Sequence, residues 1–319
     1  MTDVARQDEA PAVTTESSQL TIVAPPPPVK GQSLWGHAWQ ELRHNPLFWI
    51  SSVLIVLFVV MAIAPWLFTN TDPTAADLRR AREAPNSEAW FGRDFQGYDV
   101  YARTIYGARA SILVGLLTTL ATLVFGSLVG IIAGFYGGAS DAVLARFGEI
   151  FLAIPVLLGG ILILYRFPNN LETPYMVVVG KVVLALSIFT WPIIARLMRS
   201  SVLQAKPNDY VQAAKALGAR PARVIVSHIL PNAVAPVIVV STINLGVFIA
   251  AEATLSYLGI GLQPPAISWG LAISDGSGIG LIRTAPHILL FPSIFLSLTV
   301  LAFIMLGDAV RDALDPKLR

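Results

Sequence analysis

The sequence contains no cysteine and few charged residues. Of its 319 residues, none is Cys, four are His and only 13% are Asp, Glu, Lys or Arg. Without cysteine the chain can form neither disulfide bonds nor thiolate metal ligands. A soluble domain has about 25% charged residues, so the low charge, with 55% hydrophobic residues and a mean hydropathy of +0.65, indicates a membrane protein. The net charge of +2 is too small to indicate a nucleic-acid partner.

Several functional patterns are also missing from the sequence. There is no G-x-x-x-x-G-K-[ST] segment, so the chain has no phosphate-binding loop of that kind. A secondary transporter needs an ionisable relay at membrane depth and usually an internal repeat, and neither is recognisable. A membrane-embedded enzyme would need a convergent Ser/His/Asp set or a His/Glu metal motif in the apolar segments, which the sequence does not offer. We therefore expect no catalytic residue, cofactor site or metal site in this chain.

Long apolar runs dominate the rest of the sequence. Six segments reach the roughly 20 residues that a helix needs to cross a bilayer: residues 47–68, 110–136, 147–165, 174–195, 233–251 and 287–307. They predict an all-α integral membrane protein with six transmembrane helices. Pro155 and Pro192 fall inside two of these segments and predict kinks.

The polar stretches predict the organisation around these spans. Residues 1–33 are polar and end in four prolines, which is typical of a disordered tail with a stiff spacer. Residues 34–68 are expected to hold a short amphipathic segment, with Trp35 and Trp39 on one face, and then the first span. Residues 69–108 form an extracellular loop, 109–310 the core domain and 311–319 a cytoplasmic tail.

The basic residues predict that both termini are cytoplasmic. Arg196, Arg199, Lys206, Lys215, Arg220 and Arg223 all lie in or beside the polar stretch that follows the fourth span. Only one acid, Asp209, accompanies them, which fits the excess of Lys and Arg in cytoplasmic loops. The loop 69–108 opposes this orientation because it also holds five arginines, but it has six acids as well.

A glycine pattern marks the second predicted span. Gly126, Gly130, Gly134 and Gly138 recur every four residues and so share one helix face. Small residues at this spacing allow two helices in lipid to approach closely. The pattern is compatible with packing inside this chain and with contact to a partner subunit.

The basic stretch "PNDYVQAAKALGARPARVIVSHILPN" predicts two helices joined by a tight turn. Asn208 suits the N-cap of a first helix over 209–217, and Gly218 suits its left-handed C-cap. Pro221 suits the first turn of a second helix, which Pro231 is expected to end. A solvated amphipathic loop on the membrane surface is the alternative.

At these residues the sequence resembles a known family. "QAAKALG" followed by "SHILPN" resembles the EAA loop of ABC-importer permeases, with Gln212 in place of the usual glutamate. "FGRDFQGYDVYARTIYGARASILVG", "AEATLSYLGIGLQPPAISWG" and "LGDAVRDALDPKLR" resemble segments of dipeptide/oligopeptide (peptide/nickel) permeases. "NPLFWISSVLIVLFVVMAIAPWLF" is similar to the extra N-terminal helix of their C-type subunit. The resemblance covers about residues 40–319.

The resemblance implies a type I ABC importer permease fold and a set of partners. It implies a heterodimer with a second permease, one or two ATPase subunits that hold ATP and Mg, and an outer substrate-binding protein, all at a bacterial cytoplasmic membrane. The loop 199–231 would be the coupling element, and the ATPase contact would involve Asp209, Tyr210, Gln212, Ala213, Ala214, Lys215, Gly218, Arg220, His228 and Pro231. Since Gln212 has no charge, a salt bridge from this position is not expected.

Two further sets of residues are candidates for the transport route. Lys181, Glu149 and Glu252 are ionisable residues within or at the edge of predicted spans, where charge is costly and often functional. Extension toward the outer surface or a structural contact is the alternative for Lys181, and structural contacts are the alternative for both glutamates. Residues 252–286 are too rich in Gly and Pro for one helix and too apolar for an open loop. They predict a partly re-entrant outer cap that receives the binding protein, with Gln263, Pro264, Pro265 and Trp269.

The expected cargo is a di- or oligopeptide, with nickel or another small solute as the alternative. Nickel transport would favour imidazole ligands along the route. His37, His44, His228 and His287 do not form a cluster in the predicted topology, which favours peptides.

Overall fold

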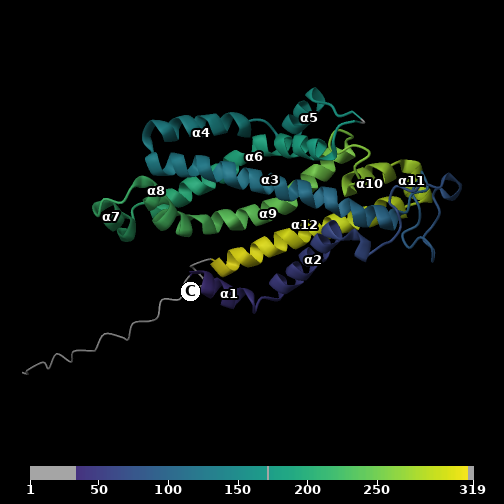
Figure 1. Ribbon diagram of the computed structural model, residues 1–319, viewed down its shortest axis with the longest axis horizontal. Helices are drawn as coiled ribbons and strands as arrows, with labels where there is room; N and C mark the ends of the chain where they lie inside the picture. Colours follow the sequence, from purple (N-terminus) through teal and green to yellow (C-terminus); the bar gives the residue numbers. More distant parts are fainter. Residues whose placement is uncertain (1–33, 171, 315–319) are drawn as a thin grey trace, which may run out of the picture. The chain divides into compact units, whose positions relative to one another are not determined.

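In the described part of the chain, the regular secondary structure is helical. The computed structural model describes residues 34–170 and 172–314, and its one β-bridge, in this part of the chain, joins Arg93 to Asp99 (Figure 1). The predicted tail 1–33, the last residues of the predicted tail 311–319 and the side chain of Trp35 lie outside the described residues. Trp39, on the short helix α1 (Leu34–Leu42), is 55% exposed.

Within the described residues, five helices are long and apolar enough to cross a membrane. They are α2 (Pro46–Ile63), α3 (Val100–Tyr136), α6 (Tyr175–Ala205), α9 (Leu230–Tyr257) and α12 (His287–Leu314). A sixth span is obtained if α4 (Gly138–Leu152) and α5 (Val156–Arg166) are counted together.

The third predicted span, 147–165, is not one continuous helix. The axes of α4 and α5 differ by 79°. The break falls just before Pro155, whose ring lacks an N–H donor and clashes with the preceding helical turn. The sequence placed a kink here, but the structure has a sharp bend between two helices.

Two other predicted boundaries are wrong. Helix α3 begins at Val100, inside the predicted loop 69–108, because the Asp99 carboxylate accepts a hydrogen bond from the Ala102 N–H at 2.8 Å and caps the helix. Pro231 does not end a helix. α8 (Pro221–Val224) continues through a π-turn, η3 (Ile225–Ile229), into α9, so residues 221–257 form one span. The Leu230 N–H donates to the Ile225 carbonyl, five residues earlier, and the wider turn accommodates the proline.

The helices α3 and α6 pack along most of their lengths, and three glycines lie between them. A Cβ added to Gly126, Gly130 or Gly134 would stand between 2.5 and 3.0 Å from a backbone carbonyl oxygen of α6. The facing carbonyls are, in the same order, those of Trp191, Ala195 and Arg199. All three glycines therefore face another helix of the same chain. Gly138 does not share this face, because α3 ends at Tyr136 and Gly138 begins α4 with a φ of +58°.

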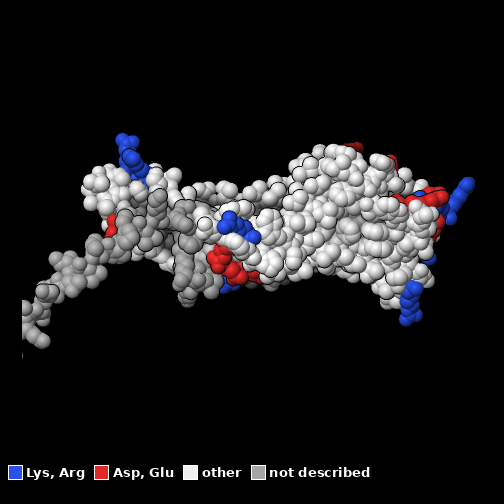
Figure 2. Space-filling view, turned by 90° about the horizontal axis from the view of Figure 1, so that it is seen from below, with Lys and Arg blue, Asp and Glu red and all other residues white. Residues whose placement is uncertain are grey.

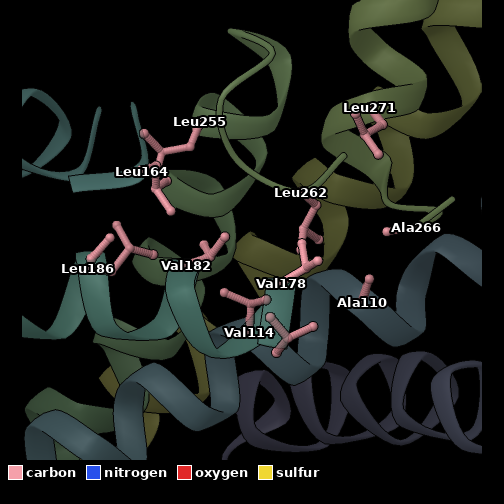
Figure 3. Packing of buried hydrophobic residues seen from close by; sticks show 12 residues of the cluster. Ala110, Val114, Leu164, Val178, Val182, Leu186, Leu255, Leu262, Ala266 and Leu271 are labelled. Atoms are coloured by element: carbon pink, nitrogen blue, oxygen red, sulfur yellow. The ribbon is translucent and has the colours of Figure 1, made fainter. Parts of the chain in front are cut away.

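A buried apolar cluster joins the helices to the segment that follows α9. We call residues 258–286 the cap segment; it includes α10 (Trp269–Gly276) and α11 (Ile279–Thr284). Figure 3 shows the converging side chains: Ala110, Val114, Leu164, Val178, Val182, Leu186, Leu255, Leu262, Ala266 and Leu271. Because Leu262, Ala266 and Leu271 belong to this cluster, the cap segment is packed into the helical core.

The two ends of the helical unit differ from its middle. α7 (Asp209–Ala216) and α8 lie at one end, called here the α7 end, and α10 and α11 lie at the other, the α10 end (Figure 1). On the face shown in Figure 2, charged side chains lie at both ends and in one group in the left half, and a broad surface between that group and the right end carries almost none. This distribution fits a membrane crossing between the two ends.

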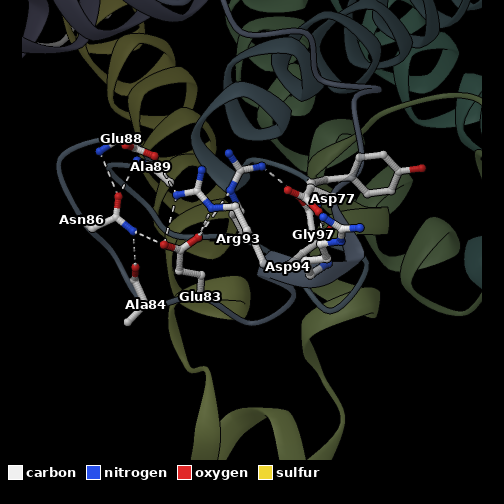
Figure 4. A network of polar contacts seen from close by, with 12 residues as sticks. Asp77, Glu83, Ala84, Asn86, Glu88, Ala89, Arg93, Asp94 and Gly97 are labelled. Atoms are coloured by element: carbon white, nitrogen blue, oxygen red, sulfur yellow. Dashed lines mark hydrogen bonds and ion pairs between the residues drawn. The ribbon is translucent and has the colours of Figure 1, made fainter.

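The loop between α2 and α3 neutralises its own charges. Glu83 receives hydrogen bonds from Arg80 at 2.6 Å and from Asn86 at 2.8 Å, and Arg80 also contacts Glu88 at 2.9 Å (Figure 4). The hydrogen bond from Arg80 lowers the pKa of the Glu83 carboxyl. Three of the five arginines of the predicted loop 69–108, Arg80, Arg93 and Arg103, are thus held in ion pairs within a folded unit.

The contact between α3 and α6 yields a stability test. We expect Gly130→Leu to lower the melting temperature of the purified protein, because a Cβ alone would stand 2.5 Å from the Ala195 carbonyl oxygen. Overpacking of this kind costs about 1–3 kcal/mol. Gly180→Leu is the matched control, since no atom lies within 4 Å of its Cβ position. Equal melting temperatures for the two variants would contradict the described packing.

Candidate functional site

The basic block, residues 206–232, is a compact helix–turn–helix at the α7 end. On α7, the side chains of Val211 and Ala214 are buried. They belong to or border a cluster with Val224 and Ile229 from the second helix and Val202 from α6. The spacing of three residues places both α7 side chains on one face. α7 is thus a short amphipathic helix that packs on its own chain through one face and leaves the other free.

The turn after α7 depends on Gly218. The Ala219 N–H donates to the Ala214 carbonyl at 3.0 Å, and the Gly218 N–H donates to the Lys215 carbonyl at 2.9 Å. This pair of bonds is a Schellman motif, which requires a left-handed residue after the helix. Gly218 has a φ of +82° and fills that position, as the sequence predicted.

Hydrogen bonds tie the two ends of the block together. The Tyr210 hydroxyl, in the first turn of α7, accepts from the Asn232 side-chain amide at 3.1 Å and lies 3.3 Å from the Asn208 amide nitrogen. The Lys206 ammonium donates to the Phe135 carbonyl at the end of α3 at 2.7 Å. α7 is therefore fixed to both α3 and α9, although the Asn208 side chain makes no N-cap hydrogen bond.

Gln212 is engaged within its own chain. Its side-chain Nε2 donates to the Lys206 carbonyl oxygen at 2.7 Å. A glutamate at this position could not donate that bond and would bring a negative charge toward the carbonyl oxygen. The departure from the EAA pattern therefore has a local effect: the glutamine amide helps to hold the residues that lead into α7.

An open groove of about 830 Å³ runs along the free side of the block. Its lining combines small or apolar side chains with three cationic or ionisable ones: Tyr210, Ala213, Ala214, Leu217, Gly218, Ala219, Arg220, Arg223 and His228. Leu217 is 89% exposed, which is unusual for a large aliphatic side chain.

The charge of the block is one-sided. Lys206, Lys215, Arg220 and Arg223 are cationic, whereas Asp209 is the single acid between residues 206 and 232. Among the described salt bridges, none includes Arg220 or Arg223. Both arginines border the groove, so their positive charge is available to a partner that enters it.

Most of the predicted coupling residues come together here. Tyr210, Ala213, Ala214, Gly218, Arg220 and His228 line the groove. Asp209 begins α7, Lys215 lies 5.7 Å from the centre of the Phe135 ring, and Gln212 faces Lys206. Pro231 is one residue inside α9 and does not border the groove. The groove residues Leu217, Ala219 and Arg223 were not among the predicted coupling residues. The hydrogen bond between Tyr210 and Asn232, which are 22 residues apart, was not predicted either.

The three candidate route residues are not brought together. The Lys181 ammonium donates to the carbonyls of Phe167 and Pro168 at 3.2 and 3.1 Å and to the Asn169 side chain at 3.0 Å. It therefore fixes the chain that leaves α5, which matches the alternative of a structural contact.

The two glutamates lie in different parts of the fold. Glu149, on α4, accepts from Arg146 at 2.8 Å and borders a cavity of about 340 Å³ between α3, α4 and α6. Glu252 is fully buried near the α10 end. Neither contacts Lys181, so the described residues show no continuous ionisable path.

The predicted cap residues divide into exposed and buried positions. Pro264 and Pro265 are exposed, and the Gln263 side chain donates to the Gly259 carbonyl at 3.1 Å. Trp269 is fully buried, and its Nε1 donates to the Thr104 carbonyl on α3 at 2.8 Å. Trp269 is thus an anchor of the cap segment and is not available on its surface.

Comparisons with known proteins agree over nearly the whole chain. Residues 126–319 match the family described as binding-protein-dependent transport system inner membrane component, and residues 33–85 match the N-terminal TM domain of oligopeptide transport permease C. The oligopeptide transport system permease protein OppC of Bacillus subtilis is 38% identical over 91% of this chain and 92% of its own length. The dipeptide transport system permease protein DppC of Alkalihalophilus pseudofirmus is 37% identical over 94% of this chain and 93% of its own.

A solved structure shares the fold at low sequence identity. It is an inward-facing conformation of the MetNI methionine ABC transporter, with a TM-score of 0.51 and 20% identity. The similarity covers 66% of this chain and 95% of that one.

The turn of the block can be tested at Gly218. We expect Gly218→Val to loosen residues 209–220, because a β-branched side chain in the left-handed region costs about 1–3 kcal/mol. No atom lies within 4 Å of the Cβ position, so only backbone strain is at issue. Gly218→Asn is the matched control, since Asn tolerates this conformation. Hydrogen exchange of the block should be faster in the valine variant alone; equal exchange in both would argue against a turn that needs left-handed backbone.

Proposed function

Because the chain belongs to the family of binding-protein-dependent transport system inner membrane components, we propose that it is the permease subunit of an ATP-driven importer of di- or oligopeptides. It forms one half of the pore and holds no ATP site of its own. The observation that supports this function most directly is the basic helix–turn–helix with its open groove, which the fold places at one end of the spans.

The cargo follows from the relatives and the architecture together. The two curated relatives described above are named as oligopeptide and dipeptide permeases, and the match to the permease C N-terminal domain covers α2. We infer that this chain is the C-type subunit and pairs with a second, homologous permease. Selection of the peptide is left to the substrate-binding protein.

We further propose that the α7 end is cytoplasmic and the α10 end faces outward. The cationic block and the ends of α1 and α12 then lie inside, as the positive-inside rule favours. The paired charges of the loop between α2 and α3 lie outside in a folded unit. In this orientation α2 and α9 run outward and α3, α6 and α12 run inward, and the six spans alternate in direction when α4 and α5 are counted as one.

In this arrangement the groove receives the ATPase subunit. Leu217 and Ala213 offer an exposed apolar surface, and Arg220 and Arg223 stand at its border. A complementary partner surface would carry an apolar side chain beside at least one carboxylate, since opposite charges across an interface favour encounter and register. Gln212 is neutral and occupied by Lys206, so the charge at this interface comes from the arginines.

Coupling then requires that the ATPase bind the block differently in its two states. A ligand shifts a conformational equilibrium only through such a difference in affinity. Movement of α7 by the closing ATPases would pull on α9, because α8, η3 and α9 form one span of 37 residues. The block would thereby act on the opposite end of the pore.

Uptake by the reconstituted complex tests the function itself. We expect vesicles that contain this chain, its partner permease, the ATPases and the binding protein to accumulate a labelled dipeptide or oligopeptide only with ATP. Without ATPases, no accumulation should occur. Accumulation of nickel but not of peptides would show that nickel is the cargo. Accumulation without ATP would refute the proposal of an ATP-driven importer.

The charge of the groove gives a second test. We expect Arg220→Glu together with Arg223→Glu to reduce co-purification of the ATPase by at least about tenfold, since like charges across an interface cost several kcal/mol. Arg311→Glu, an exposed position in the last turn of α12 at the same end, is the control. If the control loses the ATPase equally, net charge rather than the groove determines binding.

A further inference from the structure

A buried carboxylate lies where the cap segment meets α3 and α9. Glu252 is 0% exposed, and its Oε1 accepts a hydrogen bond from the Ser256 hydroxyl at 2.7 Å. The hydroxyls of Ser111 on α3 and Ser268 before α10 lie near the same carboxyl group but make no hydrogen bond of good geometry to it. Among the described residues, Oε2 has no partner at good hydrogen-bond geometry. Burying a carboxyl group this deeply costs free energy unless hydrogen bonds compensate for the lost water.

The hydroxyl oxygen of each of the three serines also lies at a backbone N–H group of the cap segment. Ser256 Oγ accepts from the Leu262 N–H at 2.9 Å. Ser268 Oγ accepts from the Leu271 N–H at 3.2 Å, and Ser111 Oγ lies 3.4 Å from the Trp269 nitrogen.

The chemistry of a hydroxyl explains why Ser256 pairs with this acid. A serine hydroxyl has one proton to donate and two lone pairs to accept. Because the Ser256 oxygen already accepts the Leu262 N–H, its proton remains for the carboxyl group. Glu252 thus orders Ser256 and, through it, the backbone of the cap segment at Leu262.

Close backbone contacts reinforce this junction. A Cβ on Gly261 would lie 2.5 Å from the Ser256 nitrogen, and a Cβ on Gly270 would lie 2.6 Å from the Ala253 carbonyl oxygen. The cap segment therefore touches the last turn of α9 directly, at Ala253 and Ser256, just after Glu252. The fully buried Trp269 closes the contact to α3 through its bond to Thr104.

We propose that Glu252 is a positioning residue that fixes the cap segment to α3 and α9, so that this segment moves with those helices and not as a free loop. The inference rests on the proposed function in one respect: if the chain is an importer, the fixed cap carries the signal from the docked binding protein to α9. Glu252 itself does not contact cargo in this account.

A buried cysteine reports whether the cap is fixed. Ala266 is 8% exposed and belongs to the cap segment, so Ala266→Cys in this cysteine-free chain should react slowly with a membrane-impermeant maleimide. With Glu252→Leu, which keeps the bulk and removes the acceptor, we expect labelling at least about tenfold faster, because the buried Ser256 hydroxyl loses its acceptor. Glu252→Gln keeps one acceptor oxygen and should give an intermediate rate.

A matched carboxyl serves as control. Glu149→Gln removes a half-exposed glutamate far from the cap, and the labelling rate of the Ala266→Cys variant should not change. If Glu252→Leu leaves the rate unchanged as well, Glu252 does not fix the cap and the proposal is wrong. This measurement does not depend on any transport activity.

ATP hydrolysis separates positioning from mere stability. In the assembled complex, we expect Glu252→Gln to keep the basal rate and to lose at least half of the stimulation by peptide-loaded binding protein. A residue that only stabilises the fold would leave the ratio of stimulated to basal rate unchanged, and that result would overturn the positioning role. A wild-type complex that peptides do not stimulate would refute the proposed cargo, while the labelling result would still stand.

Discussion

Backbone N–H and C=O groups in an apolar environment need internal partners, and the whole fold depends on this constraint. It explains why the described chain consists of helices, and it also limits where the helices can break. The bend between α4 and α5, the π-turn before α9 and the cap segment are the main departures. In the last two, local bonds replace the regular ones: the Leu230 N–H reaches Ile225, and the Leu262 N–H reaches the Ser256 hydroxyl.

The same constraint makes α9 a continuous connection between the basic block and the cap segment. Residues 221–257 form one span of 37 residues, which at 1.5 Å per residue is about 55 Å long. Its first turns belong to the basic block and its last turns carry Glu252. A helix that is continuous over this length transmits a displacement, whereas a break at Pro231 would have absorbed it. The sequence reading placed such a break there, and the π-turn is the reason that it is absent.

The sequence predicted which segments form helices better than where those helices end and which residues they contact. The all-α membrane fold is confirmed, because apolar run length is a strong and local signal. Gly218 could be placed in a left-handed turn because few other residues adopt that conformation. The bend at Pro155 was read as a kink, since a proline in a sequence does not reveal how far the next helix turns away.

Long-range contacts were beyond the sequence for a different reason. The bond between Tyr210 and Asn232, and the approach of Ser111 to Glu252 across 141 positions, depend on how whole helices are arranged. The glycine pattern showed that a helix would pack closely at Gly130 but not which one. In the same way, the sequence marked Glu252 as a residue that is costly to bury, but no motif marks its hydrogen-bond donor, Ser256.

The glutamine at position 212 shows how a motif can persist while one of its contacts changes. The α7 surface keeps the small residues, the turn and the cationic border, all of which depend on backbone geometry and shape. The one position that usually carries a charge has instead a bond to Lys206 within the chain. A partner that docks here finds α7 already held in place, so less ordering entropy is lost on binding. The partner cannot form an ionic contact at position 212. The arginines that border the groove are the groups that can form one instead.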